Sequence, residues 1–441
     1  MINLFDNYSQ VSGDLHESLL SAGYTQSTVV IEDDGFLPDN VTSPFAYYTN
    51  SYGHSGRPLY FNQVACPEFW EIRGDNNEAA IYEENKRRAN IVYVPNISHK
   101  RYVKRVEWLD LDNKIRSVDH YNKEGVIFAQ TSYNLMKQPT ITTYYNTNHN
   151  EIIVENHITK NIILNFNKQL HIFESRIEFV SQYLKHVFGD INRIFYNSLS
   201  IPFFVSYNLV QPGNDLLFWQ EPLSEDGTLP GNMLTLLQNQ GRTKKVIFQN
   251  KKDYEKARRK YPKFQEQIAY LGFLYPINDT HRERPDALIL TNSDRIEEIV
   301  KVIEKLPDIN FHIAAITEMS TKLMNLSKYK NVTLYPNIEY NQVNSLLQNC
   351  AFYLDINHGT EIGYAVRRAF LNNLLILSFE DTTHNRQFTL PEYTFKQNNG
   401  DQLINIVNQC KNNRLYMLSA LYKQQNHANQ SSILEYQDII S

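Results

Sequence analysis

A short polar stretch that follows one apolar segment combines an imidazole, a glycine and a carboxylate, and these groups could carry chemistry. His358 and Gly359 follow the apolar segment 351–356, which predicts a strand, and Glu361 lies in the first turn of the helix predicted over 361–372. In doubly wound α/β domains, ligands bind at the carboxyl ends of the strands. The stretch is therefore a candidate ligand site, although a single histidine in this position more often has a structural role.

The spacing of this stretch resembles the donor-site segment of retaining glycosyltransferases of the B-type fold. In that family a glutamate contacts the donor sugar, a glycine-containing turn follows, and a second glutamate accepts hydrogen bonds from the ribose. Glu361 stands in the first place, but Ala369, which has no side-chain acceptor, stands in the second. Ile362 replaces the glycine that often follows the first glutamate, and side chains here would crowd amides that should approach a diphosphate. The degenerate donor-site positions are His358, Gly359, Glu361, Gly363, Tyr364 and Ala369.

The segment after the first predicted strand of the same domain departs from that family in a second way. The family commonly places an arginine there, with a lysine a few residues later, to neutralise the diphosphate. This chain reads Leu-Thr-Asn-Ser-Asp-Arg-Ile-Glu-Glu over 290–298, so acidic residues replace the lysine. Because a diphosphate needs its charge compensated, it would bind poorly here. These departures predict a non-catalytic chain; the alternative is an active retaining glycosyltransferase that uses Glu361 in its own donor site.

Asp110 and Asp112 resemble the acidic pair that holds the metal of a nucleotide-sugar diphosphate. A divalent cation needs several converging oxygen ligands. The pair lies at a predicted hairpin tip beside Asn113, and Asp and Asn favour such turns for local reasons. We therefore expect a turn at this position, and we expect neither a metal nor a cofactor.

Residues 242–263 contain ten basic side chains, opposed only by Asp253 and Glu255. On a chain of net charge −5, such a cluster can attract an anionic membrane surface or an acidic partner. The alternative is an ordinary solvated helix face. The candidate contacts with an anionic surface are Lys252, Lys256, Arg258, Arg259 and Lys260.

Composition restricts the remaining classes of function. The balance of 43 Lys plus Arg against 48 Asp plus Glu predicts no nucleic-acid binding. The three scattered cysteines fit a reduced compartment, and the sequence begins without the basic and apolar regions of a signal peptide. No apolar run reaches the roughly 18 residues of a membrane span. Together these features predict a cytoplasmic protein.

The order of apolar segments predicts an α/β protein of the glycosyltransferase B-type fold, with two Rossmann-like domains facing a cleft. Apolar β segments alternate with helices in the first domain, 1–58 and 172–283, and in the second domain, 284–419. Closely spaced β segments with hairpin turns over 59–171 predict an inserted, extended antiparallel β-meander. We expect the C-terminal segment 420–441 to pack back on the first domain.

The whole chain resembles one family, the non-catalytic stabilising subunit of the bacterial O-GlcNAc transferase complex of the accessory Sec system. The resemblance rests on the combination of INLFDNYS, EDDGFLPDNVTSPF, WLDLDNKIRSVDHYNKEG and NHGTEIGYAVRRAF, and it covers nearly the full length. It implies a catalytic glycosyltransferase subunit of similar fold as partner, in a two-plus-two heterotetramer.

The resemblance also implies a substrate and a place of action. Together the two subunits would transfer GlcNAc from UDP-GlcNAc to Ser and Thr of serine-rich repeat adhesins in the cytoplasm, before export. This subunit would bind the unfolded acceptor polypeptide and stabilise its partner, with peripheral contact at the inner face of the cell membrane. Its 29 tyrosines and many asparagines suit such an acceptor, because rings and amides do not require one particular sequence.

Overall fold

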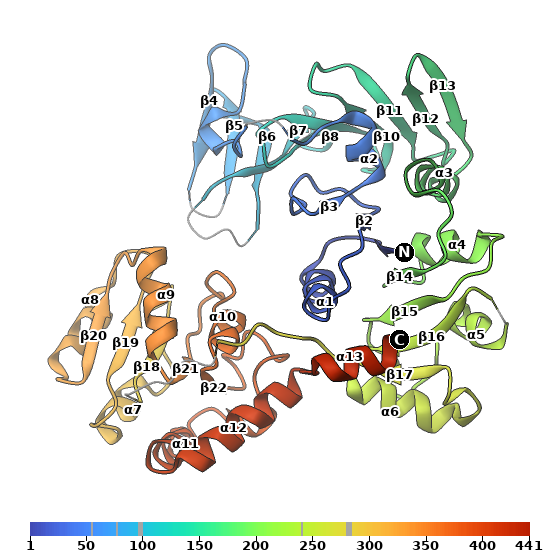
Figure 1. Cartoon of the computed structure of the whole chain (residues 1–441). Helices are drawn as coiled ribbons and strands as arrows, with labels where there is room; N and C mark the ends of the chain where they lie inside the picture. The colour runs from blue at the N-terminus through green and yellow to red at the C-terminus, as the bar shows by residue number, and fades with distance from the viewer. Residues whose placement is uncertain (54–55, 76–77, 96–99, 240, 279–284) are drawn as a thin grey trace. The chain divides into compact units, whose positions relative to one another are not determined.

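The chain forms two compact units in the computed structural model, which describes residues 1–53, 56–75, 78–95, 100–239, 241–278 and 285–441 (Figure 1). The first unit comprises Met1–Gly272 and Ile433–Ser441, and the second comprises Phe273–Ser432. The expected boundary at 283/284 lies outside the described residues. The division follows Gly272 instead, so the end of the expected first domain belongs to the second unit.

A seven-stranded parallel sheet, in the order β17-β16-β15-β14-β1-β2-β3, is the centre of the first unit. Its inner strands are short apolar runs buried along their whole length, as expected for a parallel sheet covered on both faces. The strands are β1 (Ile2–Phe5), β2 (Thr28–Val30), β3 (Val41–Thr42), β14 (Ile194–Tyr196), β15 (Asp215–Trp219), β16 (Thr243–Phe248) and β17 (Ile268–Tyr270). The helices of this unit are α1 (Gln10–Ser21), α2 (Pro44–Thr49), α3 (Arg176–Phe188), α4 (Ile201–Asn208), α5 (Gly231–Gln238), α6 (Lys251–Lys260) and α13 (Ile433–Ile440).

Between α2 and α3 the chain forms a ten-stranded antiparallel sheet whose strands follow one another in sequence order from β4 to β13. This is the expected β-meander, with three strands (β4, β5 and β13) that the sequence did not predict. The strands are β4 (Trp70–Gly74), β5 (Ala79–Glu83), β6 (Lys86–Tyr93), β7 (Val103–Leu109), β8 (Ile115–Tyr121), β9 (Ile127–Tyr133), β10 (Pro139–Tyr145), β11 (Glu151–Asn156), β12 (Ile162–Phe166) and β13 (Gln169–Phe173).

The inserted sheet shares a hydrophobic core with the parallel sheet. Ile162 and Leu164, which alternate along β12 and so point to the same face, are buried against the core that contains Phe179 and Tyr183 of α3. The insertion is therefore packed onto the first unit at this end.

A second contact joins the inserted sheet to the loop after β2. Gly35 has a φ of +84°, and a Cβ at this position would lie 2.5 Å from the carbonyl oxygen of Tyr121. The amide of Lys123 donates to the Gly35 carbonyl (2.8 Å), and the Asn122 side chain donates to the carbonyl of Ser51 (2.9 Å). Glycine permits both the left-handed backbone and the close approach. The loop after β2 is thus held against the sheet.

The second unit has a six-stranded parallel sheet in the order β20-β19-β18-β21-β22-β23. The chain begins at β18, extends the sheet to β20 on one side, and then adds β21 on the other side of β18. The strands are β18 (Ala287–Leu290), β19 (Phe311–Ala314), β20 (Val332–Tyr335), β21 (Phe352–Asp355), β22 (Leu375–Phe379) and β23 (Thr394–Phe395). The helices are α7 (Ile299–Lys305), α8 (Thr321–Met324), α9 (Tyr340–Asn349), α10 (Ala365–Leu371), α11 (Gly400–Asn412) and α12 (Arg414–His427).

The C-terminal segment is divided between the units. The expected segment 420–441 includes the end of α12, which belongs to the second unit, whereas α13 belongs to the first. The Tyr436 hydroxyl on α13 donates to the Gly272 carbonyl (2.7 Å) and is fully buried. Only the last turns of the chain, from Ile433, therefore pack on the first unit.

Candidate functional site

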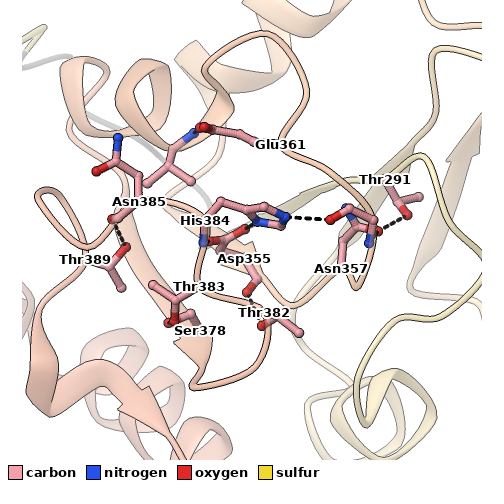
Figure 2. Close-up of polar contacts among 12 residues, drawn as sticks. Thr291, Asp355, Asn357, Glu361, Ser378, Thr382, Thr383, His384, Asn385 and Thr389 are labelled. Carbon is pink, nitrogen blue, oxygen red and sulfur yellow. Dashed lines mark hydrogen bonds and ion pairs between the residues drawn. The ribbon is translucent and has the colours of Figure 1, made fainter. Parts of the chain in front are cut away.

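The candidate site lies at the carboxyl ends of β18 and β21, where the strand order of the second sheet reverses (Figure 2). Ligands of doubly wound domains bind at such switch points. Asp355 ends β21 with its side chain 2% exposed, and Thr291 follows β18, fully buried. Both residues lie at the ends of buried apolar strands. Because the strands themselves are in the core, polar side chains are found where the strands end.

His384, after β22, is the centre of the polar contacts at this edge. Its Nδ1 and its backbone amide both lie within hydrogen-bond distance of the Asp355 carboxylate (2.6 and 2.8 Å), and its Nε2 lies 2.7 Å from the Gly359 carbonyl (Figure 2). A carboxylate and a carbonyl only accept, so both ring nitrogens must donate, which requires the imidazolium. The hydrogen bond to Asp355 accordingly raises the pKa of His384 to about 9.

The loop after β21 is also tied to the loop after β18. The Asn357 side-chain oxygen accepts from the Thr291 hydroxyl (2.8 Å) and from the amide of Gly359 (2.9 Å). Asn292 donates to the Thr360 hydroxyl (2.7 Å), and a Cβ on Gly359 would lie 1.7 Å from the Asn292 side-chain oxygen. Glycine is needed at this position because another side chain occupies the space.

Glu361 accepts a hydrogen bond from the amide of Val366 in the first turn of α10 (3.0 Å), and burial raises the pKa of its carboxyl. Gly363 and Tyr364 both have left-handed backbones before α10 begins. Ala369 is fully buried on the inner side of α10, so it lies in the core and not in the polar group. The carboxylate in the donor-glutamate position therefore caps the helix that follows it.

His358 does not join His384. Its Nε2 pairs with Glu297 at 2.7 Å, and its amide donates to the Arg295 carbonyl (3.0 Å). Glu298 accepts from the amide of Gly400 (3.0 Å). The acidic residues that replace the expected lysine thus form contacts within the second unit.

Of the expected positions, the structure brings Gly359 and Glu361 close to His384. Burial still raises the pKa of the Glu361 carboxyl, because the nearby charge of His384 offsets only part of that rise. The sequence did not predict His384 or Asn357 as site residues. One signal was available, since Asp355 ends a predicted strand and His384 shortly follows the next one. Their pairing depends on the strand order, which periodicity does not give.

The other two sequence motifs have local partners. Asp110 accepts from the amides of Asp112 and Lys114, both at 2.9 Å, in the turn between β7 and β8, so the acidic pair is a hairpin turn as expected. On α6, Lys256 pairs with Asp253 (3.1 Å). Lys260 pairs with Asp226, whereas the remaining candidate contacts are exposed: Lys252, Arg258 and Arg259.

Within the described ranges, no three or more His, Cys, Asp or Glu side chains form a group that could hold a metal ion. Nor does any described helix have the length and apolar character needed to cross a membrane.

Two parallel-sheet units, one of which carries an inserted antiparallel sheet, define a member of the B-type glycosyltransferase class. The structure of the pneumococcal O-GlcNAc transferase GtfA in complex with UDP and GlcNAc has this fold, with a TM-score of 0.51, 13% identity, and coverage of 100% of this chain and 98% of that one. A chain from the GtfA/B complex bound to UDP and GlcNAc is much more similar, with a TM-score of 0.94, 42% identity, and coverage of 99% and 98%.

Family comparisons identify the branch of that class. Residues 2–48, 70–174 and 176–259 match the GtfB N-terminal, middle and third domains, and 287–424 match the GftB/GlyA-F C-terminal domain. The UDP-N-acetylglucosamine–peptide N-acetylglucosaminyltransferase stabilizing protein GtfB of Streptococcus agalactiae is 44% identical over 95% of this chain and 94% of its own length. The chain belongs to this family of GtfB stabilising proteins.

Proposed function

We propose that the chain is the non-catalytic subunit of a protein O-GlcNAc transferase complex. It binds the serine-rich repeat adhesin acceptor and stabilises a catalytic glycosyltransferase subunit, which adds the first GlcNAc from UDP-GlcNAc to Ser or Thr. We further propose a two-plus-two heterotetramer that acts in the cytoplasm, in the accessory Sec system. The observation that carries the proposal is the 44% identity, over nearly the whole length, to a protein named for stabilising the transferase.

The geometry of the second unit supports the non-catalytic role. A donor site needs backbone amides and cationic side chains directed at a diphosphate. Here the amide of Val366 is occupied by Glu361, and the loop after β21 is held by His384 and Asn357. A nucleotide sugar would have to break these contacts before it could bind.

Calorimetric titration of the purified chain with UDP-GlcNAc, together with a hydrolysis assay, tests this role. We expect no turnover by the chain alone, and activity only after the catalytic subunit is added. The alternative, an active enzyme that uses Glu361, predicts tight binding and turnover by the chain alone, both lost in Glu361→Ala. That result would overturn the proposal.

We propose that the edge strand β13 of the inserted sheet is a docking face for the catalytic subunit. Leu170 and Ile172 on the edge strand β13 are 65% and 63% exposed, which is unusual for aliphatic side chains on an unpaired edge. Leu170→Glu with Ile172→Glu should weaken co-purification of the two subunits at least tenfold. Leu135→Glu, at an exposed hairpin tip (80%), is the matched control. Equal co-purification of both variants would exclude β13 as the docking face.

The membrane contact rests on α6. Lys252, Arg258 and Arg259 are exposed, whereas Lys256 and Lys260 have acidic partners. We expect the complex to float with vesicles that contain phosphatidylserine, and the triple alanine variant of the exposed residues to lose this at low salt. Equal flotation of variant and wild type would remove α6 from the proposal.

A further inference from the structure

The first unit contains a cavity of about 540 Å³ between the loops after β1 and β2 and one face of the inserted sheet. Asn7 and Glu32 line it from the loops after β1 and β2, and Arg105, His120 and Tyr133 line it from β7, β8 and β9. Its volume is in the range of ligand sites, and it lies at the carboxyl ends of adjacent parallel strands. Both features are typical of a binding site, although the donor-site resemblance concerns the other unit.

Charge in this cavity disfavours an anionic ligand. Lys104 pairs with Asp34 and Arg105 with Glu107, each at 2.8 Å, so the cations on this wall already have carboxylate partners. Glu32 adds a further carboxylate, which is 60% exposed and pairs weakly with Arg176, at a distance of 3.7 Å. A phosphate or diphosphate would therefore meet excess negative charge, and an uncharged ligand would not.

Beside Asp33, Ile115 and Val118, the remaining lining includes aromatic surface and uncharged polar groups. The rings of Tyr8 and Tyr133 are half-buried, so each offers an apolar face beside a hydroxyl. His120 is held by Thr131 at 2.9 Å, and burial lowers its pKa to about 4, so the ring is neutral. Asn7 is exposed at the mouth.

We propose that this cavity binds an uncharged, hydroxyl-rich segment of extended polypeptide. The inference rests on the proposed function, because it assigns the acceptor to one place in the chain. Hydroxyl and amide groups of such a segment can hydrogen-bond to Glu32, Asn7 and the tyrosine hydroxyls, while its backbone packs on the rings.

The test measures fluorescence anisotropy of a labelled, uncharged Ser/Thr-rich peptide with the full-length chain. Tyr133→Ala should weaken binding at least tenfold. Tyr145→Ala is the matched control, because Tyr145 is also half-buried and ends the neighbouring strand β10, but lies outside the cavity lining. Asn7→Trp, at an exposed loop position, should weaken binding by filling the cavity without removing a core group.

The outcomes separate this inference from the proposed function. If the wild type binds the peptide and Tyr133→Ala and Asn7→Trp bind equally well, the cavity is not the site, and acceptor binding occurs elsewhere on the chain. If the wild type does not bind the peptide at all, the acceptor-binding role itself fails. If a peptide with phosphoserines binds more tightly than the uncharged one, the charge argument is wrong and the inference is overturned.

Discussion

After β1 and β2 of the first unit the loops border a cavity of about 540 Å³, whereas after β18 and β21 of the second unit the loops hydrogen-bond to each other. Both are carboxyl ends of adjacent strands in parallel sheets, where ligands bind in this class of fold. In the first unit Glu32 and Asn7 remain exposed. In the second, Asp355 and Asn357 are buried by partners from the same unit. The same architecture can thus either receive a ligand or fill that place with its own side chains.

Of the substitutions that test this difference between the two units, removal of Asp355 should change the free energy of unfolding most. Asp355→Ala leaves two donors of His384, the ring Nδ1 and the backbone amide, without the buried carboxylate that accepts from both. Loss of one partner of a buried pair costs about 3–5 kcal/mol. We expect that loss in the free energy of unfolding, measured by urea titration. The matched variant Asp34→Ala breaks the half-exposed pair with Lys104 beside the open cavity and should lose less than about 1 kcal/mol.

If Asp355→Ala and Asp34→Ala lost similar stability, the second unit would not be held closed by its polar contacts.

The next largest effect is a dependence of the free energy of unfolding on pH, which comes from His384. Its pKa rises from an ordinary value of 6.5 to about 9 in the folded chain, mainly through the hydrogen bond with Asp355. A raised pKa contributes stability that is fully present below the unfolded value and is lost as pH rises through the folded value. We expect a contribution of about 2 kcal/mol, which allows for partial exposure of the ring.

Measurement of unfolding free energies for wild type and His384→Gln from pH 5 to pH 10 isolates this contribution, because groups common to both cancel. The difference between the two proteins should be constant below about pH 6.5 and shrink between there and about pH 9. A difference that stays constant across this range would show that folding does not change the pKa of the His384 ring.

A smaller effect is expected for Glu361. Its hydrogen bond to the amide of Val366 is a helix cap, and removal of a cap costs about 1 kcal/mol. Glu361→Ala should therefore lower stability slightly and leave activity of the reconstituted two-subunit complex largely intact. Glu361→Gln keeps an acceptor and serves as the control. A fall in activity by several orders of magnitude, in a folded protein, would instead give Glu361 a catalytic role.

The sequence predicted most of the parallel strands, because their apolar runs are bounded by polar turns, but it did not predict β3, β17 or β23. The segment 351–356, predicted as a strand, contains β21. The sequence missed β13, whose side chains are mostly exposed on both faces and so show no alternation. It also missed His384, because the bond to Asp355 joins residues 29 positions apart and depends on which strands are neighbours. The local pattern of apolar residues predicts the helices and strands, whereas the polar contacts depend on the order of the strands in the sheet.

The smallest expected effect on stability is at Glu32, on the open side of the comparison. Its carboxylate is 60% exposed and lies 3.7 Å from Arg176, which has a closer partner in Glu155 at 2.7 Å. Glu32→Gln should therefore change the free energy of unfolding by less than about 0.5 kcal/mol. If the cavity binds hydroxyl groups, the same substitution should weaken peptide binding three- to tenfold, because an amide accepts less strongly than a carboxylate. At an open site, a substitution should change ligand binding and leave stability unchanged. If Glu32→Gln instead lowered the free energy of unfolding and left peptide binding unchanged, this carboxylate would have a structural role, like that of Asp355.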